Sequence, residues 1–172
     1  MADRHLVISR EQLRATVSAL GARISSDYAG KDLVLIGVLN GAFIFLADLV
    51  RAVTIPHQID FIRVASYGQS DSSSGTIRLA KDVELDLRDR HVLLVEDIVD
   101  TGTTLAWLSE RFKDRQAASV RICALIDKKE RRQTEVPLDY VGFAEDGFLV
   151  GYGLDFAEQY RYLPEIYSLS FP

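Results

Sequence analysis

The sequence is poor in cysteine and has no long apolar run. Its single cysteine, Cys123, excludes an internal disulfide and any zinc site built on several cysteines, which favours a reducing compartment. No segment reaches the roughly 18 consecutive apolar residues of a membrane-spanning helix. The first residues also lack the charged and then apolar profile of a signal peptide. We therefore expect a soluble cytoplasmic protein with no membrane contact.

An excess of positive charge is also missing. The 172 residues include 20 Lys and Arg against 25 Asp and Glu, for a formal net charge of -5. Proteins that bind nucleic acid by neutralising many phosphates need a basic surface, so general nucleic-acid binding is not expected. Any phosphate ligand has to be held locally. The length and the 48% hydrophobic content suit one domain with a sizeable core.

Apolar periodicity predicts alternating helices and strands. Ser9 and Gln12 form a capping-box pattern at the start of a first helix. Helical spacing recurs at residues 42–53 and 103–113, and apolar runs predict strands at residues 32–39, 59–66, 92–95 and 120–126. Such alternation is typical of an α/β fold with a central, mostly parallel twisted sheet flanked by helices.

Two regions interrupt this alternation. Residues 67–75 (YGQSDSSSG) are polar and rich in Ser and Gly, so we expect a mobile loop. Short strands are expected at residues 140–143, 148–152 and 166–169, with no long helix between them. We predict one domain over residues 1–172. Its core would span about 30–130, and a small C-terminal hood would span about 137–172 together with the N-terminal segment.

The most informative segment is residues 96–104 (EDIVDTGTT), which follows an apolar strand. Its second half, from Asp100 to Thr104, offers backbone N–H groups, a glycine and hydroxyls at a helix N-terminus, all suited to a phosphate monoester. Its first half, Glu96 and Asp97, would repel a phosphate but suits sugar hydroxyls or a hard metal ion. Ligands of open α/β sheets bind at the carboxyl ends of strands. The segment therefore predicts a phosphorylated-sugar site.

Other interpretations of this segment are weaker. A helix N-cap rich in Asp and Thr is common in proteins without any ligand. Here, however, two adjacent acids, a third acid and Thr-Gly-Thr-Thr follow a buried strand in sequence. A nucleotide P-loop is excluded because Gly-Lys-Ser/Thr is missing, and a dinucleotide site because Gly-x-Gly-x-x-Gly is missing.

Residues 96–104 resemble the phosphoribosyl-pyrophosphate signature of the hypoxanthine-guanine phosphoribosyltransferase family. Three further stretches agree in order and spacing. Residues 38–43 (VLNGAF) resemble the family's pyrophosphate loop, and residues 65–68 (ASYG) the start of its mobile catalytic loop. Residues 148–155 (FLVGYGLD) together with Arg161 resemble its purine hood. The resemblance spans about residues 35–161, which is most of the chain.

This resemblance implies a type I phosphoribosyltransferase fold and an activity in purine salvage. The enzyme would transfer the 5-phosphoribosyl group of phosphoribosyl pyrophosphate to N9 of a 6-oxopurine, hypoxanthine and/or guanine. The products would be IMP or GMP and pyrophosphate, with Mg²⁺ as cofactor. The resemblance also implies a homodimer or homotetramer.

For the sugar, the resemblance implies that Glu96 and Asp97 stabilise the positive charge that develops on the ribose as its C1–O bond breaks. The 5'-phosphate would be held by the segment's second half: Thr101, Gly102, Thr103 and Thr104. Asp100 would act as the base near N7 of the purine.

For the pyrophosphate, the implied ligands are the turn Leu39, Asn40 and Gly41, through backbone N–H groups, and Arg161, through charge-assisted bonds. Asp155 would bind the metal, together with Glu96 and Asp97. Many relatives carry Lys or Arg where this chain has Asn40, so we expect an altered pyrophosphate affinity.

For the purine, Lys128 would donate to the 6-oxo group, Phe148 would stack on the ring and the backbone of Leu149 would read its edge. Ser66 and Tyr67 would belong to a loop that closes over the site and excludes water.

Asp127, next to Lys128, leaves the ranking of hypoxanthine, guanine and xanthine open, and a xanthine-preferring enzyme is one alternative. A second alternative is an RNA-binding regulator of pyrimidine genes on a related fold. Such a regulator needs a dense basic face, and Glu130 interrupts the only candidate cluster, residues 128–132.

Overall fold

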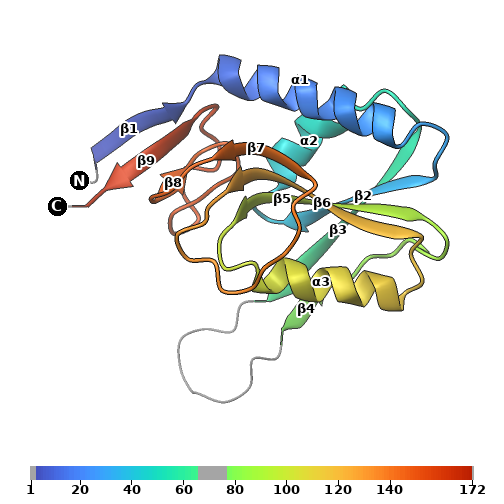
Figure 1. The fold of residues 1–172 in the computed structure, drawn as a ribbon. Coiled ribbons are helices and arrows are strands. Elements are labelled where there is room, and N and C mark those ends of the chain that lie inside the picture. Colours follow the sequence, from blue (N-terminus) through green and yellow to red (C-terminus); the bar gives the residue numbers. More distant parts are fainter. Residues whose placement is uncertain (1–2, 66–76, 172) are drawn as a thin grey trace.

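A computed structural model of the chain describes residues 3–65 and 77–171, and Figure 1 shows the arrangement of their helices and strands. The elements, in chain order, are β1 (Asp3–Ile8), α1 (Arg10–Asp27), β2 (Leu33–Leu39), α2 (Phe43–Ala52), β3 (His57–Ala65), β4 (Arg78–Lys81), β5 (His91–Val99), α3 (Thr103–Asp114), β6 (Ser119–Asp127), β7 (Tyr140–Ala144), β8 (Leu149–Val150) and β9 (Ile166–Ser170). The predicted α/β fold is confirmed.

The main sheet has the strand order β4-β3-β2-β5-β6-β7. Strands β3, β2, β5, β6 and β7 run parallel, and β4 is antiparallel to β3. The register brings Leu39 of β2 beside Arg63 of β3, and Val99 of β5 beside Asp127 of β6. The carboxyl ends of the parallel strands therefore meet at one edge, where ligands bind in open α/β sheets.

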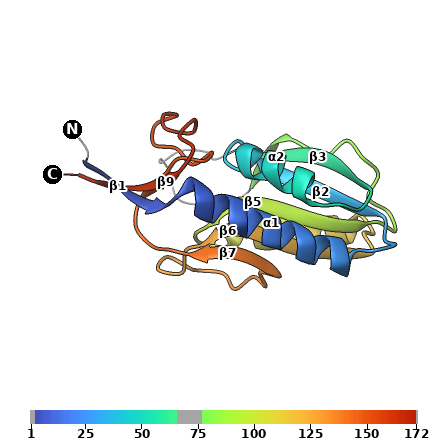
Figure 2. The ribbon, with the colours of Figure 1, turned by 90° about the horizontal axis from the view of Figure 1, so that it is seen from above.

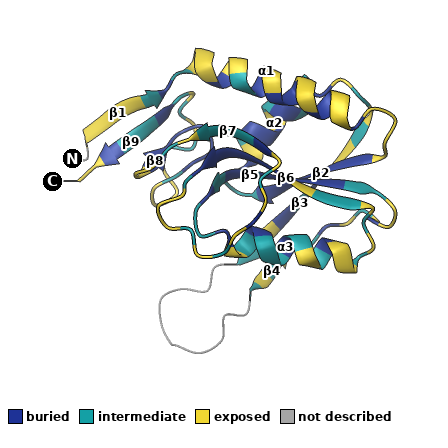
Figure 3. Cartoon of the chain, in the orientation of Figure 1, coloured by how far each residue is buried: buried dark blue, intermediate teal, exposed yellow. Residues whose placement is uncertain are grey.

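Helices cover both faces of this sheet, with α1 and α2 on one side and α3 on the other (Figure 1). Leu35 of β2 belongs to an apolar cluster with residues of α1 and α2, whereas its neighbour Ile36 belongs to a cluster with residues of α3. Successive strand residues point to opposite faces, so both must be apolar when both faces are covered. The outer surfaces of the helices are exposed (Figure 3).

The predicted capping box at the start of α1 is confirmed. The backbone N–H of Gln12 donates to Ser9 Oγ at 3.2 Å, and the Ser9 N–H donates to Gln12 Oε1 at 2.9 Å. These reciprocal bonds satisfy two of the donors that a helix start leaves unpaired. None of the described helices is long and apolar enough to cross a membrane.

A second, smaller antiparallel sheet has the order β1-β9-β8. Strand β1 pairs with β9, so the two ends of the described chain lie side by side (Figure 1). Seen from above, this sheet and the loop before β9 lie beyond the carboxyl ends of the main strands (Figure 2). We call residues 145–171 together with β1 the hood.

Two sequence-based predictions are wrong in detail. Residues 140–143 were expected in the hood, but β7 pairs in parallel with β6 and forms an edge of the main sheet. The strand predicted at residues 92–95 continues as β5 to Val99, because its pairing with β6 continues to that point. Glu96 and Asp97 therefore lie in a strand and not in a loop. Strand β4 was not predicted.

Candidate active site

The turn after β2 lies against the end of β5 and against the hood. The Leu39–Asn40 peptide bond is cis. A Cβ atom on Gly41 would overlap Asp97 Oδ2, and a Cβ atom on Gly153 would overlap the carbonyl oxygen of Gly41. The turn thus meets the side chain of Asp97 on β5 and the backbone of the hood, and only glycine leaves room for both contacts.

The acidic pair lies at the end of β5. Asp97 is 8% exposed, and its Oδ1 accepts the N–H of Ile98 at 2.7 Å. The N–H of Asp97 donates to Glu96 Oε1 at 3.1 Å. Burial raises the pKa of both carboxyls, and the nearby charge of Asp97 raises the pKa of Glu96 further. Two such carboxylates are stabilised by hydroxyl donors or by a cation, as the sequence predicted for this half of the segment.

The loop from β5 to α3 forms an anion-binding shape. Gly102, the N-cap of α3, has φ of 81° and gives the helix no side-chain cap. The N–H groups of the first turn of a helix carry partial positive charge and bind anions when no cap occupies them. The loop and the adjoining ends of β5 and α3 enclose a cavity of about 160 Å³. It is lined by Glu96, Ile98, Val99, Asp100, Thr101, Gly102, Thr104 and Leu105. Thr103 instead bonds Thr134, with 3.1 Å between their hydroxyl oxygens.

Asp100 has two different carboxylate oxygens. Its Oδ2 lies 3.2 Å from Nη1 of Arg131, an ion pair at the surface. Its Oδ1 is buried and has no hydrogen-bond partner within the described part of the chain. A buried acceptor without a partner is costly, so a proton donor at this point would be bound favourably.

The purine-binding residues predicted from the sequence surround the same edge. Lys128 follows β6, and its N–H donates to Val99 O at 3.0 Å. Its largely buried side chain places Nζ 3.0 Å from Glu130 Oε1. Phe148 is 42% exposed and contacts two other phenylalanine rings edge-on, while Leu149, the next residue, is buried in β8.

Arg161 is fixed within the hood. Its Nη1 donates to Gly153 O at 2.7 Å, and its Nη2 lies 3.0 Å from Asp155 Oδ1. The positive charge of Arg161 also reaches Asp97, where it favours the ionised carboxylate against the effect of burial. Because Gly153 touches the turn at Gly41, the arginine is held beside both the turn and the acidic pair.

A metal site made of protein groups alone is not present in the described residues, which contain no cluster of three His, Cys, Asp or Glu side chains suited to a metal ion. Asp155 is paired with Arg161. Mg²⁺ commonly binds through one or two carboxylates and completes its shell with substrate phosphates and water. Glu96, Asp97 and Asp155 fit that kind of shared site, and their role as metal ligands stays a prediction.

The sequence did not reveal every residue that shapes the site. Arg132 was considered only as part of a basic cluster and Gly153 only as part of the hood stretch, and Thr134 was not considered, because the partners of all three lie in other segments of the chain. Ser66 and Tyr67 lie outside the described residues, so their predicted catalytic role is not tested.

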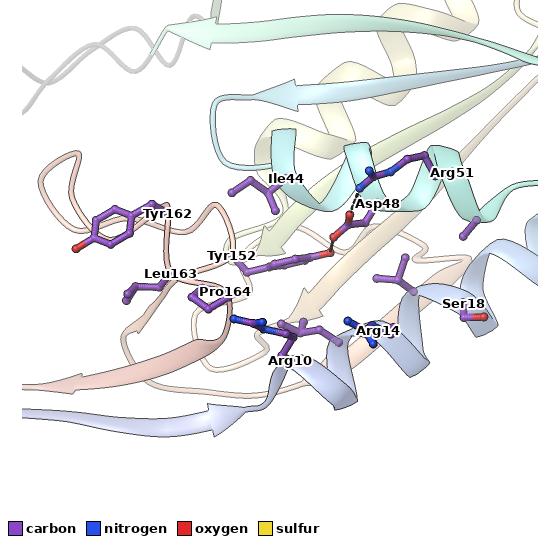
Figure 4. Close-up of a pocket in the computed structure, with 13 residues that line it drawn as sticks. Arg10, Arg14, Ser18, Ile44, Asp48, Arg51, Tyr152, Tyr162, Leu163 and Pro164 are labelled. Carbon is purple, nitrogen blue, oxygen red and sulfur yellow. Dashed lines mark hydrogen bonds and ion pairs between the residues drawn. The ribbon is translucent and has the colours of Figure 1, made fainter.

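A larger hollow of about 560 Å³ lies between α1, α2 and the hood (Figure 4). None of the residues of the loop between β5 and α3 lines it. On its wall, the hydroxyl of Tyr152 donates to Asp48 Oδ2 at 2.5 Å, and Asp48 also pairs with Arg51. We place the active site at the smaller cavity, because Glu96, Asp100 and the uncapped helix start line it, while Asp97 lies beside it against the turn at Gly41.

Known proteins resemble the chain over nearly its whole length. The phosphoribosyl transferase domain family matches residues 9–157. The chain is 42% identical to a hypoxanthine phosphoribosyltransferase of Salmonella typhimurium, over 94% of this chain and 92% of that protein. It is 44% identical to a hypoxanthine-guanine phosphoribosyltransferase of Mycobacterium bovis, over 96% of this chain and 86% of that protein.

The fold agrees with this similarity. A crystal structure of a hypoxanthine phosphoribosyltransferase from Staphylococcus aureus superimposes with a TM-score of 0.92 and 37% sequence identity, covering 96% of this chain and 91% of that one. A hypoxanthine-guanine phosphoribosyltransferase from Bacillus anthracis gives 0.89 at 38% identity, covering 98% of this chain and 100% of that one. With the family matched over most of its length, the chain belongs to the phosphoribosyl transferase domain family.

Proposed function

We propose that this chain is a purine-salvage enzyme that transfers the 5-phosphoribosyl group of phosphoribosyl pyrophosphate to N9 of hypoxanthine and/or guanine, yielding IMP or GMP and pyrophosphate. The observation that carries the proposal is the loop between β5 and α3. At the end of β5 and in this loop, the acidic pair, an Asp100 Oδ1 with no partner among the described residues and an uncapped helix N-terminus follow one another in nine residues. A ribose, a protonated purine nitrogen and a 5'-phosphate would occupy these three features in the same order.

In this reaction the C1–O bond to pyrophosphate breaks and a bond from C1 to N9 forms, while the purine loses a proton. Glu96 and Asp97 would bind the ribose hydroxyls and stabilise the positive charge that builds up on the sugar. Asp100 Oδ1 would accept the proton at N7. The N–H groups from Thr101 to Thr104 would hold the 5'-phosphate throughout.

The departing pyrophosphate needs compensation for its negative charge. The backbone of the turn Leu39–Asn40–Gly41 and the guanidinium of Arg161 would bind it. We also propose Mg²⁺ as the cofactor, held by Asp155, Glu96 and Asp97 together with substrate oxygens. When bound, the ion would neutralise phosphate charge as a Lewis acid.

Selection of a 6-oxopurine would depend on Lys128. Its ammonium group can only donate, so it favours a 6-oxo group over the 6-amino group of adenine. Phe148 leaves 42% of its surface exposed, enough for a purine to stack on it. Asp127 had left the ranking of hypoxanthine, guanine and xanthine open, and its carboxylate is paired with Arg132 at 2.5 Å. Hypoxanthine and guanine are favoured over xanthine because the similar proteins are named for them.

The RNA-binding regulator is not favoured. The basic residues that it would use each face a carboxylate: Lys128 faces Glu130, Lys129 faces Asp127, Arg131 faces Asp100 and Arg132 faces Asp127. A cluster neutralised in this way offers few free charges to a phosphate backbone.

We further propose that the enzyme acts in the cytoplasm as a homodimer or homotetramer. A buried free thiol, Cys123, suits a reducing compartment. Sedimentation of the purified protein would measure the oligomeric state, and cell fractionation its location. A monomer at working concentration would contradict the proposed homodimer or homotetramer.

One assay tests the proposed function. The protein is incubated with phosphoribosyl pyrophosphate, Mg²⁺ and, in separate reactions, hypoxanthine, guanine, xanthine or adenine, and nucleotide formation is followed by chromatography. We expect IMP and GMP, and no AMP. Absence of product from every purine would refute the enzyme, and XMP as the main product would identify the xanthine-preferring alternative.

A further inference from the structure

The loop between β5 and α3 has little that holds its own shape. From Asp100 to Gly102 the chain leaves the sheet, and Gly102 adopts a left-handed conformation without a capping side chain. The carbonyl groups of the loop instead accept hydrogen bonds from residues 128–134, a stretch that follows β6. The N–H groups of Gln133 and Thr134 both donate to Thr101 O at 3.0 Å, and a Cβ atom on Gly102 would overlap Thr134 O.

Arg132 is the side chain that completes these contacts. Its Nε donates to Asp100 O at 3.0 Å, and its Nη2 reaches Val99 O at 3.5 Å. The same Nη2 donates to Asp127 Oδ1 at 2.5 Å. One guanidinium therefore joins two successive carbonyls of the loop to a carboxylate at the end of β6. Since Asp127 pairs with Val99 in the sheet register, the anchor is a rigid strand.

Both charged groups are almost removed from water. The side chains of Arg132 and Asp127 are only 12% and 10% exposed. A buried charge is tolerated when it is paired and hydrogen-bonded, and here both Nε and Nη2 of Arg132 have acceptors. Neighbouring Arg131, by contrast, is 64% exposed and reaches the carboxylate of Asp100 rather than its backbone. The two adjacent arginines thus hold different parts of the same residue.

We propose that Arg132, fixed by Asp127, is a positioning residue that holds the β5–α3 loop in the shape that binds the 5'-phosphate of phosphoribosyl pyrophosphate. The inference rests on the proposed function. It depends on the fork of the guanidinium, because a lysine ammonium at this place could not reach the carboxylate and both carbonyls at once. Arg132 is not among the residues that line the cavity, so it would act through the loop.

The test compares Arg132→Lys with wild type and with Arg115→Lys as the control. Arg115 lies just after α3, away from the loop, and also bonds both a carboxylate, that of Asp82, and a backbone carbonyl, that of Leu85. Binding of phosphoribosyl pyrophosphate is measured by calorimetry. Arg132→Lys is expected to weaken it about tenfold, the loss of one charge-assisted hydrogen bond. Arg115→Lys should bind like wild type.

A second variant separates positioning from a general loss of stability. Asp127→Asn keeps an acceptor for Arg132 but removes the charge, so it should weaken binding in the same direction and by less. The double variant should lose less binding free energy than the sum of the two single losses, because both changes act on one pair. In steady-state assays with Arg132→Lys, we expect the KM for phosphoribosyl pyrophosphate to rise while the KM for hypoxanthine changes less than about twofold.

Two results would overturn the proposal. One is wild-type binding of phosphoribosyl pyrophosphate by Arg132→Lys, and the other is an equal loss in the Arg115→Lys control. If Arg132→Lys shows no cooperative unfolding, and so is not folded, the test uses Asp127→Asn. Binding of phosphoribosyl pyrophosphate by that variant with wild-type affinity would then overturn the proposal. Failure of the wild type to form nucleotide would reject the proposed function, which is a different outcome, because the calorimetric comparison can still be made.

Discussion

Asp100 offers one carboxylate oxygen to Arg131 and leaves the other buried without a partner among the described residues. That difference holds the side chain in place through one oxygen and leaves the other free to accept a hydrogen from a ligand. Asp100→Asn keeps the size of the side chain and loses the basicity. We expect the variant to bind phosphoribosyl pyrophosphate like wild type and to turn over about 10²-fold or more slowly. Single-turnover kinetics and calorimetry measure the two quantities, and undiminished turnover would remove Asp100 from the role of base.

Lys128 and Lys129 are adjacent but differ in burial, with side chains that are 11% and 75% exposed. We expect Lys128→Ala to raise the KM for hypoxanthine about tenfold or more, since a charged donor to the 6-oxo group is lost. Affinity for phosphoribosyl pyrophosphate should be spared. Lys129→Ala is the matched control and should leave both constants unchanged. Equal purine constants in wild type and Lys128→Ala would contradict the assignment.

Asp60, inside β3, gives the protein a pH-dependent stability. Burial opposes its ionisation, but N–H donors from Phe61, Glu84 and Leu85 outweigh burial and lower its pKa below 3.8. A carboxyl whose pKa is lower in the folded state stabilises that state above the unfolded pKa, and the contribution is lost as the pH falls through the folded pKa.

We therefore expect Asp60→Asn to lower the free energy of unfolding by about 1–3 kcal/mol at pH 7. The difference from wild type should shrink as the pH is lowered toward 3. Urea unfolding at a series of pH values measures it, and a difference independent of pH would show that the charge of Asp60 is not involved.

At the scale of elements, strand and helix types were predictable because both faces of the sheet are covered and the strands are continuously apolar. Their limits were less predictable. The prediction ended the central strand at Val95, since Glu96 and Asp97 are polar, but pairing with β6 carries β5 to Val99. The short β7 was assigned to the hood because its five residues do not indicate which strand they pair with.

Gly41 offers an element-scale test, because its turn meets Asp97 without room for a side chain. We expect Gly41→Ala to reduce kcat/KM for phosphoribosyl pyrophosphate at least about tenfold, as the turn moves off the end of β5. Gly30→Ala is the control. Gly30 has φ of 74° in open space after α1, so its variant should lose stability but keep activity. Equal kinetic losses in the two variants would attribute the effect to stability alone.

For the whole molecule, the two apolar clusters lie on opposite faces of one sheet, which joins them. Cys123 of β6 is fully buried in one cluster, and burial raises the pKa of its thiol to about 12. Thiol reagents attack the thiolate, so the folded protein should resist them.

We expect iodoacetamide at pH 8 to alkylate Cys123 only at the rate of unfolding, and at once in denaturing urea. Mass spectrometry over time measures the rate. Rapid alkylation without urea would mean that the sheet opens locally near β6. The acidic pair was predicted from a local pattern and Lys128 from the resemblance to a known family, whereas the Arg132 contacts depend on how residues 128–134 return to the loop, which no local pattern contains.

The contacts of Gly41 with the Asp97 side chain and of Gly153 with the Gly41 carbonyl have a consequence for how this enzyme can change. The two glycines leave no room for a side chain of their own, so a substitution at either one shifts the turn relative to β5 or the hood. Lys128 and Phe148 are instead predicted to contact the base with side chains that single substitutions can replace. We therefore expect directed evolution to obtain new base preferences readily, while the sugar donor stays the same.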